Sequence, residues 1–132
     1  MFQKANPKEL KLKEEKLAKD IINFLLEHEL FDDAFVYVNG KRYGTYDGKH
    51  YYYGSNSWND VYVEDNKNPK DYFQYAGNYL SMSFEGPLYD VVNCYFDIPG
   101  NQKLEAEFSN IFHKHGFYYE LGNAWNLTAV KE

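Results

Sequence analysis

The sequence contains few residues that could act as metal ligands, nucleophiles or catalytic acids in a familiar pattern. Its four histidines include His113 and His115, whose types and spacing suggest a metal-binding pair. Residues two apart on a helix point in directions about 200° apart, so both rings could reach one ion only where the helix ends between them. We therefore expect His113 on the surface and His115 at the edge of the core, with no metal site.

Cys94 and Glu85 are the two other candidates for chemistry. Cys94 lies in an apolar stretch, which favours an inert buried thiol over a reactive thiolate, although a pairing with a histidine in space stays open. Glu85 follows Phe84 and precedes a Gly-Pro break, and aromatic surroundings can raise a carboxyl pKa and so create a general acid. An acid before a Gly-Pro break is also typical of a solvated turn or a helix cap, which is the interpretation we favour.

Aromatic residues are far more prominent than catalytic ones. The sequence has no phosphate-binding glycine loop, no nucleophile elbow and no series of metal ligands, so it predicts no catalytic constellation and no cofactor. The fourteen tyrosines, ten phenylalanines and two tryptophans make up 20% of the chain. Tyrosine combines an apolar ring with a polar tip, which suits half-buried sheet faces and contact surfaces. The aromatic residues are therefore the best guide to a binding site.

Two tight turns predict how the central aromatic residues are arranged. Asn39-Gly40 separates the strand-like residues 34–38 and 41–46, and Asp47-Gly48 separates the latter from residues 50–53. Each pair is a strong hairpin signal, because both turn positions favour a positive φ. Two-residue loops would place Tyr37 opposite Arg42 and Arg42 opposite Tyr53 in a three-stranded meander.

The alternation of this meander separates two faces. Val36, Val38, Tyr43 and Tyr52 would form the core face. The opposite face, called here the tyrosine-rich face, carries the predicted binding residues Phe35, Tyr37, Arg42, Tyr46, Tyr51 and Tyr53. A helix over the valine side would leave it as an exposed aromatic platform, of the kind that dominates protein contacts. The alternative is that another helix or strand covers this face and makes its tyrosines part of the core.

Apolar periodicity and turn residues predict the remaining elements. The first helix would begin with Asn6 as its N-cap and Pro7 at its first position, and would run to about Leu30. The further elements are expected to be a strand over residues 58–64, a short helix over 70–76, a strand over 79–84, a helix or strand over 88–95, a helix over 104–115, and strands over 117–121 and 124–130 that turn at Gly122-Asn123. This order predicts one predominantly antiparallel α+β domain over residues 1–132, made of an N-terminal helix (1–30), a β-meander (34–64) and a mixed remainder (69–132).

Charge and hydropathy exclude several classes of function. The net charge is −6, and all of it arises after residue 30, where the aromatic sheet is predicted. Nucleic-acid binding needs a cationic groove, so the sequence disfavours it. A mean hydropathy of −0.71 and the lack of an apolar run of about 20 residues argue against a membrane protein. The lysine-rich start is unlike a signal peptide, and with a single cysteine we expect a cytoplasmic protein.

One part of the chain resembles a recurring segment of known proteins. Residues 70–76 (KDYFQYA) and 80–93 (LSMSFEGPLYDVVN), preceded by residues 38–43 (VNGKRY), are similar to small uncharacterised proteins of conjugative elements and prophages in Gram-positive bacteria. No activity or site residue comes with that resemblance. It implies a context in which small acidic proteins often act by occupying a host defence protein.

The function expected from these observations is non-enzymatic binding of a protein partner through the tyrosine-rich face, as an accessory or host-directed inhibitor protein of a mobile element. A different class stays open, namely a small hydrolase or ligand-binding protein with a tyrosine-lined pocket around Glu85. A third interpretation makes the same face the interface of a homodimer.

Overall fold

The N-terminal helix forms because its apolar residues recur every three or four positions. The computed structural model describes residues 7–132, in which α1 spans Pro7–Glu27 and buries Leu17, Ile21 and Leu25 completely. The predicted N-cap, Asn6, lies outside the described residues. The helix ends three residues before the predicted Leu30, because Glu29 adopts a φ of 53° and the Leu30 N–H donates to the Leu25 carbonyl at 2.7 Å. These features form a Schellman-type end without glycine.

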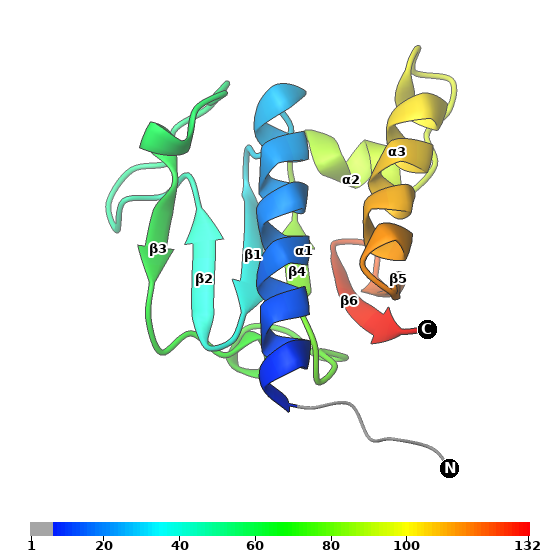
Figure 1. The fold of residues 1–132 in the computed structure, drawn as a ribbon. Helices are drawn as coiled ribbons and strands as arrows, with labels where there is room; N and C mark the ends of the chain where they lie inside the picture. Colours follow the sequence, from blue (N-terminus) through cyan, green and yellow to red (C-terminus); the bar gives the residue numbers. More distant parts are fainter. Residues whose placement is uncertain (1–6) are drawn as a thin grey trace.

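A six-stranded antiparallel sheet provides the surface on which this helix packs (Figure 1). The strand order is β3-β2-β1-β4-β6-β5. The strands are β1 (Ala34–Val38), β2 (Lys41–Gly44), β3 (Tyr62–Glu64), β4 (Ser81–Phe84), β5 (Phe117–Asn123) and β6 (Asn126–Lys131). The helices α2 (Pro87–Val92) and α3 (Asn101–Lys114) complete the α+β fold that the sequence predicts, and α2 decides between the helix and the strand left open for residues 88–95.

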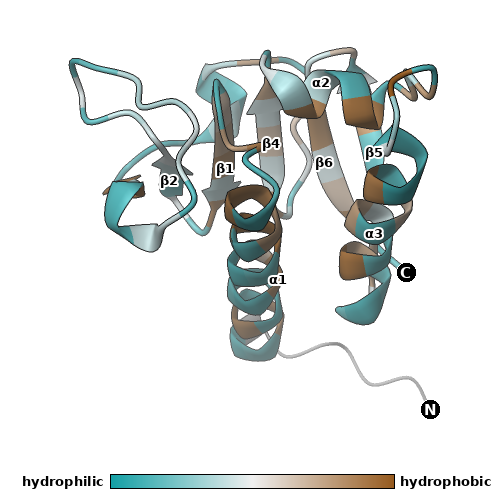
Figure 2. Cartoon of the chain, turned by 90° about the horizontal axis from the view of Figure 1, so that it is seen from above, coloured by the Kyte–Doolittle hydropathy of each residue, from teal (hydrophilic) through white to brown (hydrophobic). Residues whose placement is uncertain are grey.

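The helices α1 and α3 lie on one face of the sheet and enclose the core with it. Seen from above, the strands form one row and α1 and α3 a second layer (Figure 2). The largest fully buried side chains of this core include Phe84 from β4, Phe108 and Phe112 from α3, and Phe117 from β5. In Figure 1, β2 and β3 extend to one side of α1, so α1 does not cover this end of the sheet. Within residues 7–132, none of the helices combines the length and the apolar character needed to cross a membrane.

The β1–β2 hairpin confirms the register predicted from Asn39-Gly40. Tyr37 pairs with Arg42 and Val36 pairs with Tyr43, while Asn39 and Gly40 adopt φ values of 49° and 80°. Such positive φ values are what a two-residue hairpin turn needs.

The predicted third strand of the meander does not form. The Asp47 carboxylate accepts hydrogen bonds from the backbone N–H groups of Lys49 and His50, at 2.8 Å and 2.7 Å. This local turn competes with a two-residue hairpin loop. Tyr46 consequently faces Tyr51 in an isolated bridge, and β2 pairs with β3 instead of residues 50–53.

Other boundaries differ from the prediction for equally local reasons. Residues 58–60 and 69–71 form single 3₁₀ turns, each started by a side-chain oxygen, from Ser57 and Asn68, that accepts a backbone N–H. The predicted helix over residues 70–76 is therefore wrong, and the predicted strand over 58–64 shortens to β3. The last hairpin turns at residues 124 and 125 instead of Gly122-Asn123, because the Asn123 side chain accepts the N–H of Trp125 at 3.0 Å.

The burial of Phe84 predicts a large and specific cost of removing its ring. Phe84→Ala should lower the free energy of unfolding by about 3–5 kcal/mol, because the ring is fully buried between the sheet and the helices. Phe96→Ala is the matched control, since Phe96 is 42% exposed, and should cost less than about 1 kcal/mol. Urea unfolding followed by circular dichroism measures both. Equal costs would contradict the assignment of the core.

Candidate functional site

The alternation of β1 turns three of the predicted binding residues away from the helices. Val36 and Val38 belong to the core, so Phe35 and Tyr37 point to the opposite face, where Arg42 of β2 pairs with Tyr37. Gly44 faces Phe35 across the hairpin, and a Cβ at position 44 would lie 2.6 Å from the Phe35 ring. The glycine therefore lets this ring lie against β2.

A cavity lies at the centre of this face, where large aromatic rings stand beside small side chains. On the β4 side, Phe35 and Tyr37 pair with serines, and their small side chains leave open space beside the rings. The cavity has a volume of about 270 Å³. It is lined by Asp33, Phe35, Tyr37, Arg42, Tyr51, Tyr72, Phe73, Ser83, Glu85 and Trp125. The fold thus brings together four of the six predicted binding residues and joins them to Glu85.

Arg42 is held rigidly at the edge of this cavity. Its Nε and Nη2 donate to Oε1 of Glu64, at 3.0 Å and 2.7 Å, and its guanidinium carbon lies 4.3 Å from the centre of the Phe35 ring and 4.9 Å from that of Tyr72. Burial lowers the pKa of Arg42, but hydrogen bonding and charge interactions with Tyr37 and Glu64 outweigh it, so the pKa is raised overall. The guanidinium is therefore charged, stacked and already paired with a carboxylate.

Tyr37 is buried, which agrees with the alternative prediction that another segment covers the tyrosine-rich face. Its side chain is 3% exposed, because Tyr72 and Phe73 lie over it with ring centres 5.7 Å away. Burial raises the pKa of its hydroxyl, although hydrogen bonds to Arg42 and Ser83 act in the opposite direction. The segment after the 69–71 turn thus covers this part of the face, and Phe35 beside it is half-buried.

The other tyrosines of this face lie at its rim. Tyr46 stacks on Tyr51 with ring centres 4.5 Å apart, and Tyr51 is exposed. Tyr53 is 63% exposed, and its hydroxyl donates to Asp33 at 3.3 Å. Tyr52 was predicted to lie in the core, but it is 40% exposed because the absent third strand leaves it outside the sheet, stacked on Tyr62. The tyrosine-rich face is therefore covered at its centre and open along one side.

Two carboxylates give the cavity an acidic side. Asp33 and Glu85 both line it, and the backbone N–H of Glu85 donates to the Asp33 carbonyl at 3.0 Å. Glu85 lies at the end of β4 and is exposed. No histidine lines the cavity within the described residues. The arrangement suits the binding of a positively charged group better than proton transfer.

The residues considered for metal or thiol chemistry lie elsewhere. His115 contacts Asp20 with Nε2 and Oδ2 2.6 Å apart and is half-buried, whereas His113 pairs with Glu132 on the surface. These positions agree with those expected for the two histidines. Cys94 is exposed, so the prediction of a buried thiol is wrong: α2 ends before it, and the chain continues as a surface loop. Among residues 7–132, no group of three or more histidine, cysteine or acidic side chains could hold a metal ion.

Sequence reasoning missed the residues that complete the cavity from distant segments. Tyr72 and Phe73 follow a 3₁₀ turn, and Trp125 occupies the turn of the last hairpin, where its ring lies 5.8 Å from that of Phe73. Adjacent aromatic residues after a proline turn were the available signal for Tyr72 and Phe73. No local pattern places Trp125 beside them.

A scan against models of protein families, together with searches of curated proteins and of solved structures, gives no significant match. The functional interpretation therefore depends on the geometry and chemistry of this face.

The difference in burial between Tyr37 and Tyr53 gives a direct test of this geometry. Tyr37→Ser should lower the free energy of unfolding by about 3 kcal/mol, because a buried ring is lost. Tyr53→Ser should change it by about 0.5 kcal/mol or less, since the Tyr53 ring meets solvent. Urea unfolding of the two variants compares the costs. A large cost for Tyr53→Ser would mean that the rim of the face belongs to the core.

The turn at Asp47 predicts an unusually acidic carboxyl group. Hydrogen bonds from the backbone of His50 and Lys49, and then from the Tyr52 hydroxyl, lower the pKa of Asp47 from 3.8 to about 2. Because the pKa is lowered on folding, the carboxylate stabilises the turn above pH 4, and this contribution should disappear as the pH falls from about 4 to about 2. Carbon-detected NMR titration should find this pKa, and a higher one in Tyr52→Phe. An ordinary pKa in the wild type would contradict the turn geometry.

Proposed function

We propose that this chain is a non-enzymatic protein-binding module that holds its partner through the tyrosine-rich face. The observation that carries the proposal is the cavity of about 270 Å³ between half-buried rings and exposed ones. This volume lies just below the range of about 300–1,000 Å³ common for small-molecule pockets. It suits a single anchoring side chain of a partner, which is how central positions of protein interfaces are often filled.

The rigidity of the cavity supports this function. Arg42 is fixed by Glu64 and by the Phe35 and Tyr72 rings, and Tyr46 is stacked on Tyr51. Side chains ordered before binding lose little conformational entropy when a partner arrives. Aromatic residues held in this way provide contact area at a low entropic cost.

The charges of the cavity favour a basic anchor. Arg42 is the basic residue of the lining, and it is paired with Glu64, so the carboxylates of Asp33 and Glu85 line the cavity without an ion-pair partner among the lining residues. A lysine or arginine of the partner would lie against aromatic rings and close to these carboxylates. The net charge of −6 would also speed the approach of a basic partner.

The context we propose follows from the resemblance of residues 70–93 to proteins of Gram-positive mobile elements. A small acidic protein that binds the basic surface of a host protein would act in the cytoplasm as an accessory or inhibitor protein of the element. Tyr72 and Phe73, which cover Tyr37, and Glu85 all belong to the segment that carries the resemblance.

One observation favours the alternative of a hydrolase or ligand-binding protein. Asp33 and Glu85 line the same cavity, as a pair of acid and base residues would have to do. Hydrolysis of a substrate by the purified chain, lost in both Asp33→Asn and Glu85→Gln while the fold is kept, would establish that class. The absence of a histidine from the lining and the exposure of Glu85 make protein binding the better supported function.

Site-specific crosslinking tests the proposed binding face. A photo-crosslinking phenylalanine at position 53 should capture a partner in Gram-positive cells, because Tyr53 is exposed at the rim of the cavity. The same group at position 96, in the loop between α2 and α3, is the matched control and should capture much less. Asp33→Asn combined with Glu85→Gln should weaken capture from position 53 about tenfold or more, as expected when charged contacts are removed from an interface.

Three outcomes would contradict the proposal. Equal capture from positions 53 and 96 would show that the face is not specific, and no capture from positions 51, 53 and 72 would show that it is not an interface. A crosslinked product of twice the chain mass of 15.6 kDa would instead identify this face as the homodimer interface.

A further inference from the structure

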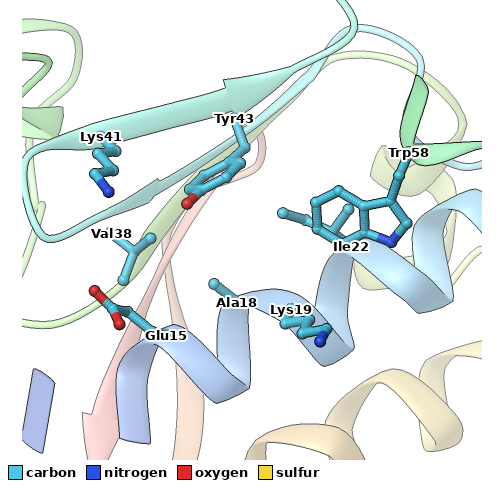
Figure 3. Close-up of a pocket in the computed structure, with 8 residues that line it drawn as sticks. All are labelled: Glu15, Ala18, Lys19, Ile22, Val38, Lys41, Tyr43 and Trp58. Carbon is cyan, nitrogen blue, oxygen red and sulfur yellow. The ribbon is translucent and has the colours of Figure 1, made fainter. Parts of the chain in front are cut away.

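A second and larger cavity lies on the helix side of the sheet, away from the tyrosine-rich face. Its volume is about 460 Å³, and it lies between α1 and the β1–β2 hairpin (Figure 3). It exists because α1 covers β1 while β2 and β3 extend beyond the helical layer. The flank of α1 and the uncovered face of β2 therefore form the two walls of an open groove, which we call the α1–β2 groove.

The floor of the α1–β2 groove is apolar, and its residues Ala18, Ile22 and Val38 are at most 4% exposed. Ala18 and Ile22 come from consecutive turns of α1, and Val38 and Tyr43 come from the hairpin. Ala18 has the shortest side chain of the lining residues that α1 contributes, so the groove is deepest beside it. Trp58 bounds the groove next to Ile22, and its indole N–H donates to Oδ1 of Asn23 at 2.6 Å. This bond fixes the indole ring against α1.

The charged groups of the groove are two lysines and one glutamate. Lys19 lies on the α1 side and Lys41 on the β2 side. Neither ammonium group forms an ion pair within residues 7–132, whereas Oε1 of Glu15 accepts a hydrogen bond from the Asn39 side chain at 3.4 Å. The groove is thus locally basic in a chain whose net charge is −6.

We propose that the α1–β2 groove binds a small carboxylic acid with an apolar aliphatic or aromatic body. The body would lie between Ala18 and Tyr43, and the carboxylate would pair with Lys19 or Lys41. The cavity volume falls within the range of about 300–1,000 Å³ typical of small-molecule sites, and the groove combines an apolar floor with charged groups at its sides. This site is independent of the tyrosine-rich face, so either assignment can fail without the other.

Trp58 provides a built-in probe for the test. The chain has two tryptophans, so Trp125→Phe leaves Trp58 as the single indole fluorophore. Octanoate, used below its micelle concentration, should change the Trp58 emission in a saturable way. Octanol and octylamine, which share the apolar body, should bind about two- to fivefold more weakly, because neither can form an ion pair with a lysine. Changes in the amide chemical shifts of Ala18 and Tyr43 in the NMR spectrum report binding to the wild-type chain, so this measurement does not depend on Trp125→Phe.

Variants of the groove residues test the contributions of charge and of shape to ligand binding separately. Lys19→Ala combined with Lys41→Ala should remove the preference for octanoate over octanol while leaving the binding of octanol unchanged. Ala18→Met should weaken both ligands, because the longer side chain fills the groove. Lys103→Ala removes an exposed lysine on α3, outside the groove, and should change neither affinity.

The proposal would be overturned if octanoate caused neither a saturable change of emission nor shifts at Ala18 and Tyr43. It would also be overturned if octylamine bound as well as octanoate, or if the double lysine variant kept the preference for the acid. If the groove variants altered self-association or capture of a protein partner while octanoate failed to bind, the groove would be a protein-docking surface instead.

Discussion

The register of the β1–β2 hairpin is the constraint on which the rest of the structure depends. It places Val36, Val38 and Tyr43 towards the helices and Phe35, Tyr37 and Arg42 towards the opposite face. A slip of one residue in β2 would exchange its faces, moving Arg42 beside the apolar flank of α1 and Tyr43 beside Tyr37. The guanidinium would then lose Glu64 and its stacking partners, which makes the slipped register costly.

The tyrosine-rich face shows how a short segment can turn an open sheet face into a cavity. Residues 72 and 73 cover Tyr37 without forming a helix or strand, so they close only part of the face. Trp125 packs against Phe73 from the last hairpin and supports this cover. A complete second layer would have made the face a core, and a bare sheet would have lacked a concave site. Partial cover leaves the space that a ligand group can enter.

Much of the fold follows from local sequence signals, and the failures have identifiable causes. The Asn39-Gly40 turn predicted the register of Tyr37 and Arg42, and apolar spacing predicted α1 and α3. The third strand failed because the Asp47 carboxylate binds the backbone of its own turn, which also moved Tyr52 out of the core. Hydrophobic alternation cannot reveal such competition, because it depends on one side-chain oxygen.

The candidate site was predictable to the extent that it is built from one hairpin. Phe35, Tyr37 and Arg42 share a face because strand residues alternate, so the sequence alone brought them together. Trp125 reaches the cavity through long-range packing, for which a single sequence carries no signal, whereas Tyr72 and Phe73 were marked only as adjacent aromatic residues after a proline turn. The degree of cover over Tyr37 was therefore the point that sequence reasoning left open.

The two cavities differ in charge although they share the same hairpin. Towards the tyrosine-rich face, Arg42 is neutralised by Glu64, so Asp33 and Glu85 determine the charge that a ligand meets. Towards the helices, Lys41 of the same strand has no ion partner within residues 7–132 and faces an apolar groove together with Lys19. A cation that suits the first cavity would be repelled by the second, and an acid that suits the second would be repelled by the first. The two faces of one hairpin thus present opposite charges to a ligand, with Asp33 and Glu85 on one side and Lys19 and Lys41 on the other.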